Sequence, residues 1–366
     1  MTEANPVVAA GNSTEDLAPG FNIVAVAIEL KELHRLADIT LAESTPDLTW
    51  PAQIDELADR LGALQAQAPD ALLYLLFFGA ARTSERYSSH HALVCAVAVK
   101  ECAAHLNFSA AETHSLVCAA LTMNLSITAL QDELVHRDRT PTLNQRLAID
   151  NHAHASVEML RARGITDELW LSVVGHHHEE LAAPAEGADA AAEQRLASVL
   201  QRIDRCAARV SPRRTRKGMP AMLAIRDAYL GNKGRSDAIG IAVTKALGIH
   251  PPGSAVVLSN GDTAIVLRRG ERPSQPVVAS LTAAGRKPLI PAVLRDTSRG
   301  EIKVKNAIRV DELRVAPEHE RLWVLLAAGL PAAEAAGPQA SVAADADAPA
   351  SEAAKSEYFA SAERAA

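Results

Sequence analysis

Three consecutive histidines, His176–His178, follow an apolar helical segment and constrain the fold more than any other feature of this chain. Imidazole titrates near neutral pH and is the commonest metal ligand, so a histidine cluster favours metal or phosphate chemistry. Adjacent helical positions point about 100° apart, so only two of the three side chains can face one site. Further ligands must then come from other helices. The structural alternative is a solvated helix end whose cationic character suits the helix dipole.

Three other segments with helical spacing also carry a histidine or an aspartate among apolar residues. The residues concerned are His90, His91, His152, His154 and Asp204. Taken singly, each is more often a helix cap or a satisfied interior group than a metal ligand. Together they are hard to explain by packing, because burying a polar group without a hydrogen bond costs about 2–7 kcal/mol. The sequence therefore predicts a polar site within a helical core.

The order of these residues resembles the HD-GYP branch of the HD phosphohydrolases. The likeness extends over roughly residues 80–250 and includes a Tyr-x-x-His motif ending at His90, a His-His-Glu motif starting at His177, and an Ile-Asp pair ending at Asp204. Proteins of this family are helical, bind two or three transition metals and hydrolyse the bacterial second messenger cyclic di-GMP. The resemblance implies a mainly α fold, with an HD-type helical bundle at its centre.

The resemblance also implies a set of metal ligands. These are His90, His152, His177, His178 and Asp204. His152 stands at the family's His-Pro motif, although Ala153 replaces the proline, and Glu179 completes the His-His-Glu motif.

Two departures from the family affect the expected chemistry. Met123 and Asn124 stand where the family has its namesake His-Asp pair, and Ile127 replaces the lysine that follows. The family's Gly-Tyr-Pro loop is also missing, because residues 180–193 form an Ala-, Glu- and Asp-rich stretch. The family aspartate normally bridges two metals, a role that a neutral asparagine cannot fill. We therefore expect hydrolysis of a phosphodiester to be lost or very slow.

The remaining ligands are sufficient for one divalent transition metal, which would be iron, manganese or zinc. A single metal can still lower the pKa of a bound water towards neutrality. The clamp that two metals place on the attacking and leaving oxygens would be missing. The alternative is a protein that binds no metal.

A dense basic run follows Asp204 in a chain whose net charge is −7. Arginine suits phosphate oxygens because its guanidinium binds them bidentately. The candidate phosphate-binding residues are Arg209, Arg213 and Arg214. The alternative is a solvated basic loop. A nucleic-acid partner is disfavoured, because the chain is acidic overall and only 3% aromatic.

Composition, helix-capping residues and turn residues predict the order of structural elements along the chain. A capping box at Ser109 and glycines at Gly164 and Gly248 mark helix ends. Asn260-Gly261 between two apolar runs predicts a β-hairpin. The expected order is a disordered N-terminus at 1–20, an N-terminal helical region at 21–80, an HD-GYP-like helical domain at 81–250, a small β subdomain at 251–315, a closing helix at 316–330 and a disordered tail at 331–366.

Other sequence features predict a soluble, cytoplasmic protein. The four cysteines lie within apolar helical patterns rather than at close, ligand-like spacing, which is typical of reduced core thiols. No signal peptide is visible, and no apolar run approaches the roughly 20 residues that a membrane-spanning helix needs.

Three hypotheses about function follow. The first is a degenerate HD-GYP protein of cyclic di-GMP signalling, which binds a metal, a cyclic dinucleotide or another signalling protein and has weak or no phosphodiesterase activity. The second is an active metal-dependent phosphohydrolase with a rearranged site. The third is a metal-free interaction scaffold in which the histidines bind neither a metal nor a nucleotide.

Overall fold

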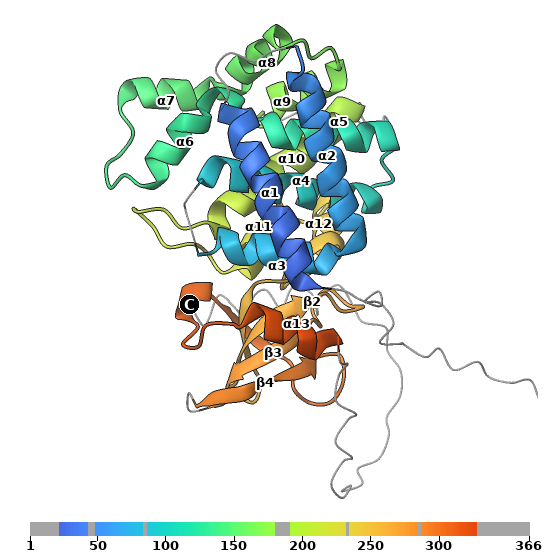
Figure 1. The fold of residues 1–366 in the computed structure, drawn as a ribbon, viewed down its shortest axis with the longest axis vertical. Helices are drawn as coiled ribbons and strands as arrows, with labels where there is room; N and C mark the ends of the chain where they lie inside the picture. The colour runs from blue at the N-terminus through green and yellow to red at the C-terminus, as the bar shows by residue number, and fades with distance from the viewer. Residues whose placement is uncertain are drawn as a thin grey trace, which may run out of the picture.

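The computed structural model describes residues 22–42, 48–82, 86–179, 191–231, 234–284 and 287–327. These residues form a bundle of α-helices with a small antiparallel sheet at the C-terminal end (Figure 1). The mainly α fold class with a small C-terminal β part is thus confirmed. The tails expected to be disordered lie outside the described residues, as does most of the 180–193 stretch.

Three N-terminal helices pack against the rest of the bundle. They are α1 (Ile23–Ala42), α2 (Trp50–Gln67) and α3 (Pro69–Ala80). A proline in the first turn starts both α2 and α3, where its missing N–H is not needed. All three helices contact α4, and α2 also contacts α5.

Nine helices make up the described central part of the bundle. They are α4 (Tyr87–His105), α5 (Ala110–Thr122), α6 (Thr128–Val135), α7 (Leu143–Asp150), α8 (His152–Ala162), α9 (Glu168–His176), α10 (Ala192–Val210), α11 (Ala221–Leu230) and α12 (Ala238–Leu247), with a 3₁₀ turn at Leu125–Ile127. Helix α4 lies at the centre, because it contacts the three N-terminal helices as well as α5, α6, α10 and α12. Its apolar residues therefore occur on every face.

The helix ends follow the signals in the sequence. Ser109 and Glu112 form the expected capping box at the start of α5. Gly164 and Gly248 both adopt positive φ where helices end, at +86° and +78°. These caps satisfy backbone groups that the helices leave unpaired.

The stretch Ala110–Val135 is long and apolar enough to cross a membrane by length and composition alone. In this structure the 3₁₀ turn at Leu125–Ile127 divides the stretch, and 61% of its most apolar window is buried against the protein. Burial of this kind is typical of a core helix.

The sheet has five antiparallel strands in the order β4-β3-β2-β1-β5. The strands are β1 (Ala255–Leu258), β2 (Thr263–Arg268), β3 (Val277–Thr282), β4 (Pro288–Asp296) and β5 (Val304–Ile308). The predicted hairpin is confirmed, since β1 pairs with β2 and Gly261 has a φ of +84° at the turn. Strand β4 is not predicted from the sequence, because it contains two prolines; it lies at the sheet edge, where proline is tolerated.

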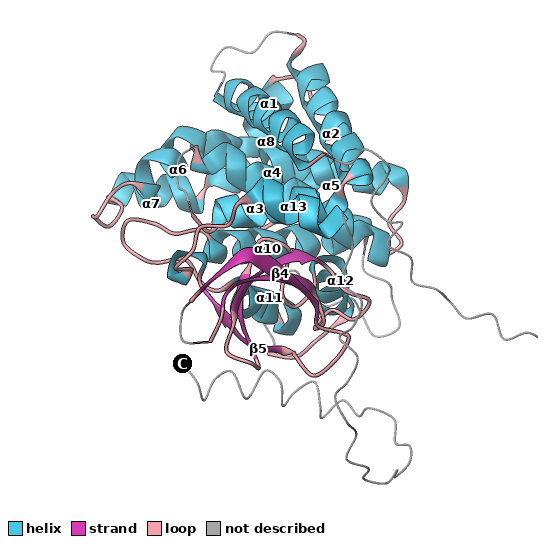
Figure 2. Ribbon diagram, turned by 60° about the horizontal axis from the view of Figure 1, so that its bottom comes forward, coloured by secondary structure: helices cyan, strands magenta, loops and turns pink. Residues whose placement is uncertain are grey.

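The sheet curves against one end of the bundle (Figure 2). Helix α13 (His319–Ala327), preceded by a 3₁₀ turn at Val310–Glu312, packs against α1, β2 and β4. The Tyr74 hydroxyl of α3 lies 2.7 Å from Nδ1 of His319. One hydrophobic core includes residues of the helices and of the sheet, such as Leu93, Ile265 and Trp323.

A buried cluster of charged groups also joins the sheet to the helices. Arg269, directly after β2, donates to Asp70 of α3 at 2.6 Å and to Glu101 of α4. It also donates to the Ala246 carbonyl of α12. The amide of Gln65 donates to Glu101 at 2.8 Å. Each charge in this cluster has a partner, as buried charges require.

We expect Arg269→Met to destabilise the protein strongly, because it leaves Asp70 and Glu101 partly buried without their cation. Breaking a buried ion pair by removing one partner costs about 3–5 kcal/mol. Urea denaturation followed by circular dichroism measures the free energy of unfolding. The control is Arg272→Met at an exposed position on the next loop. If both variants lost the same small amount of unfolding free energy, the cluster would contribute little to stability.

The stability of the folded chain should also depend on pH through His250. Burial lowers the pKa of His250 to about 4, whereas an unfolded histidine titrates near pH 6.5. Below about pH 6.5, His250 binds a proton in the unfolded state but stays neutral in the folded state. The contribution of His250 is therefore fully present above pH 6.5 and is lost as the pH falls towards 4, by up to about 1.4 kcal/mol per pH unit.

Chemical denaturation between pH 7 and pH 4.5, with a chelator present, measures this dependence. His250→Gln removes the titrating group, so this variant should lose less stability than the parent protein over that range. An unchanged pH dependence would contradict the assignment.

Candidate metal centre

Five polar residues from four helices gather in the core of the bundle. They are His91 near the start of α4, His152 at the start of α8, His177 and His178 directly after α9, and Asp204 within α10. Helix α10 contacts both α4 and α9, and α8 contacts α9, so the four helices surround one region.

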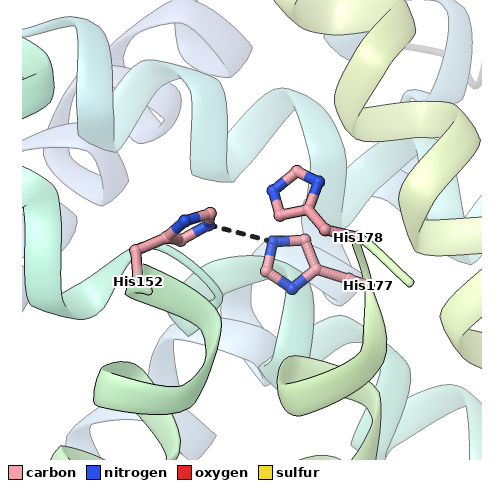
Figure 3. Close-up of side chains that lie close together, drawn as sticks. All are labelled: His152, His177 and His178. Carbon is pink, nitrogen blue, oxygen red and sulfur yellow. Dashed lines mark hydrogen bonds between the residues drawn. The ribbon is translucent and has the colours of Figure 1, made fainter. Parts of the chain in front are cut away.

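His152 and His177 face each other through ring nitrogens (Figure 3). Their Nε2 atoms are 3.3 Å apart, and both side chains are almost completely buried. The Nδ1 atom of His152 lies 2.5 Å from the Ile149 carbonyl, and that of His177 lies 2.6 Å from the Val174 carbonyl. A carbonyl only accepts, so Nδ1 carries a proton in both rings, and the neutral form of each ring keeps its lone pair on Nε2.

Two such lone pairs, with their nitrogens 3.3 Å apart, repel each other unless a proton or a metal ion lies between them. A backbone carbonyl that holds the Nδ1 proton is also the usual support of a metal-binding histidine. Two nitrogens at about 2.0–2.1 Å from a tetrahedral zinc ion would be about 3.3 Å apart. The separation of His152 and His177 therefore fits a shared metal ion.

His178 completes this group from the solvent side. Its ring centroid is 4.8 Å from that of His152 and 4.1 Å from that of His177, and its side chain is partly exposed. Ligand atoms of the three histidines all lie within 4.8 Å of one another. Burial, together with the nearby charge of His178, lowers the pKa of His177 to about 3, and burial also lowers the pKa of His178. Both rings are therefore neutral at pH 7, as metal binding requires.

His91 and Asp204 form a second group beside the first. Nε2 of His91 lies 2.8 Å from Oδ1 of Asp204, whose side chain is only 13% exposed. Burial by itself would raise the pKa of Asp204, but the hydrogen bond with His91 and the charges of three histidines hold that pKa below its usual range. The carboxylate of Asp204 influences the pKa of both His177 and His178, so the two groups lie close to each other.

The structure does not bring two neighbouring histidines to this site. His90 instead lies 3.0 Å from the Leu76 carbonyl through Nε2, and its ring contacts that of His34. Successive positions on α4 point about 100° apart, so only one of His90 and His91 can face α10. His176 hydrogen-bonds through Nδ1 with the Ser172 carbonyl at 2.7 Å.

Met123 and Asn124 lie between the helices that carry the histidines. The residue before them, Thr122, accepts a 2.8 Å hydrogen bond from the Trp170 indole of α9. Two residues after them, the Ser126 hydroxyl donates to the His152 carbonyl at 2.9 Å. Helix α5 ends at Thr122, Met123 is buried and Asn124 directly precedes the 3₁₀ turn. Among the five gathered residues, Asp204 supplies the one carboxylate.

The three candidate phosphate-binding arginines lie in different surroundings. Arg213 lies over the ring of Tyr87, 5.9 Å from its centroid, and Tyr87 in turn stacks on His91. Arg209 forms an ion pair with Asp227 of α11. The backbone N–H of Arg214 donates to the Val135 carbonyl, and its side chain is exposed. Of the three, Arg213 is linked to the metal site through contacts with other side chains.

Comparison with known proteins does not assign the chain to a family. No protein-family model matches the chain, and no curated protein matches it. A solved structure described as Bd1817, a HDG"Y"P protein from Bdellovibrio bacteriovorus, matches 63% of this chain and 73% of its own length. The two chains are 14% identical, with a TM-score of 0.47. This degree of similarity assigns neither a family nor an activity.

We expect His177→Ala to remove one equivalent of bound metal, because His177 Nε2 points directly at His152. Elemental mass spectrometry on untagged protein purified without chelator measures the metal content. The control is His176→Ala, one residue earlier, whose ring makes a local hydrogen bond instead. Circular dichroism checks that both variants fold. Equal metal content in the parent protein and in His177→Ala would remove this histidine from the site.

Proposed function

We propose that this chain is an HD-type metal-binding protein of cyclic di-GMP signalling whose phosphodiesterase activity is weak or lost. The observation that carries the proposal is the gathering of His91, His152, His177, His178 and Asp204 from four helices. These residues follow the family's order of ligands, with His91 in place of His90. The family's His-Asp pair is replaced by Met123 and Asn124 at the edge of the same region.

The charge of the site favours one metal ion rather than two. Two divalent cations in a catalytic pair lie about 3.5–4 Å apart and need anionic ligands to offset their repulsion. Here Asp204 is the one carboxylate of the five gathered residues, so it contributes a single negative charge. A bound metal would polarise a phosphoryl oxygen and lower the pKa of a coordinated water. With one such ion, the leaving oxygen lacks its counter-charge, and we infer slow hydrolysis.

Each residue of the candidate site has a distinct role in this proposal. His152 and His177 hold the ion from the buried side, with their tautomers fixed by backbone carbonyls. Asp204 supplies the charge and is oriented by His91. His178 lies at the exposed edge, where a ligand can approach. Arg213, through Tyr87, offers a cation for a phosphate group.

The test combines binding and turnover of cyclic di-GMP on metal-loaded protein. Isothermal titration calorimetry should show binding that weakens in Arg213→Ala, while chromatography should show little or no linear product. The control is Arg214→Ala on the same loop. Turnover at ordinary enzyme rates would refute the impaired site and favour an active phosphohydrolase. Metal-loaded protein that binds no cyclic dinucleotide would refute the proposed ligand.

The double variant Met123→His, Asn124→Asp should restore part of the family chemistry. The added carboxylate can bridge a second ion, so we expect a second equivalent of metal and at least a tenfold rise in phosphodiesterase rate. Asn124→Asp is nearly isosteric, and Met123→His alone serves as the control because it adds no charge. If the double variant gains neither metal nor rate, Asn124 does not occupy the position of a bridging ligand.

A further inference from the structure

A second group of metal-ligand side chains lies on α2 and α5, apart from the histidine site. It consists of Asp55 on α2 and of His114 and Cys118 on α5. His114 precedes Met123 by nine residues, which is about 13 Å along a helix. No residue of this group belongs to the proposed phosphodiesterase site, so the inference is independent of that function.

The spacing of the group follows from helix geometry. His114 and Cys118 are four residues apart, so they lie on the same face of α5. The Sγ atom of Cys118 is 3.5 Å from Nε2 of His114. Helix α2 packs against α5 and places Oδ1 of Asp55 at 3.2 Å from the same nitrogen.

These separations match the edges of a zinc tetrahedron. With Zn–S near 2.3 Å and Zn–N and Zn–O near 2.0–2.1 Å, the expected S···N and N···O distances are about 3.6 Å and about 3.3 Å. The third pair, Cys118 and Asp55, also lies within 4.8 Å. Little rearrangement is therefore needed to place one ion between the three atoms.

In any one tautomer, Nε2 of His114 can form a full hydrogen bond with only one of its two neighbours. In a neutral imidazole, Nε2 either donates a proton or accepts one. If it donates to Asp55, it has no lone pair for the thiol of Cys118; if it accepts from the thiol, it offers no proton to Asp55. A cation accepts electron pairs from all three atoms and removes the conflict.

Burial and charge also suit a cation. Cys118 is fully buried, whereas the side chains of His114 and Asp55 are 43% and 51% exposed, so the group opens to solvent. Burial raises the pKa of Cys118, and the negative charges of Asp55, Asp167 and Asp59 raise it further. Asp59 lies one turn after Asp55 on α2 and is exposed.

We propose that Asp55, His114 and Cys118 form a zinc site that fastens α2 to α5. A thiolate, an imidazole and a carboxylate are typical zinc ligands, and water or Asp59 can take the fourth position. Zinc binding displaces the thiol proton of Cys118 to solvent as the Zn–S bond forms. The site stabilises the packing of the N-terminal helices on the bundle.

Cobalt(II) titration of the full-length, untagged apoprotein tests this site, because a cobalt–thiolate bond gives a charge-transfer absorption in the near ultraviolet. We expect the band in the parent protein and its loss in Cys118→Ser. It should persist in Cys95→Ser, which removes the buried thiol near His91, and in His177→Ala. A band that disappears only in Cys95→Ser, or that never forms, overturns the proposal.

Two exposed positions keep the test valid if Cys118→Ser fails to fold. His114→Gln and Asp55→Asn should each weaken zinc binding at least tenfold in competition with a chromophoric chelator. In the His177→Ala background, which lacks the histidine site, zinc should still raise the melting temperature. Adding His114→Gln or Asp55→Asn to that background should abolish this rise. Unchanged zinc affinity in both variants would show that the three side chains form only a surface hydrogen-bonded group.

Discussion

The burial of α4 on nearly every face is the constraint on which the rest of the structure depends. A helix in this position must satisfy each polar side chain that it carries through a neighbouring element. Nε2 of His91 pairs with Asp204 of α10, while Ser88 binds Asp132 of α6 and Glu101 binds Arg269 beyond β2. Each contact fixes another element against α4, so the central helix also determines where the ligand-bearing helices lie.

Much of the fold and part of the site could be predicted from local sequence signals. The capping box at Ser109 and the turn at Gly261 act over a few residues, so their patterns are legible without tertiary context. The triple histidine also indicated that two side chains at most could share a site. The choice between His90 and His91 was not predictable, because α4 is apolar all round and shows no preferred face. Strand β4 was obscured by its prolines.

The two groups of candidate ligands differ in how the chain prepares them for a cation. At His152 and His177, backbone carbonyls hold the Nδ1 protons, so the Nε2 atoms of two buried rings already face each other. At Asp55 and Cys118, the packing of α2 on α5 brings the carboxylate and the sulfur close to His114, and a proton must leave the thiol before it can bind a metal. Three histidines with an open position are typical of catalytic zinc centres, whereas thiolate ligands are common in structural ones.

The cluster around Arg269 has a consequence for the order in which the chain folds during synthesis. Asp70 and Glu101 belong to helices made early, but the cation that neutralises them is encoded about 170–200 residues later. Until that segment leaves the ribosome, α3 and α4 contain two carboxylates whose burial is unfavourable. The neutralised packing of α3 and α4 therefore depends on a residue after β2, so these two helices reach their most stable arrangement only once that segment has been made.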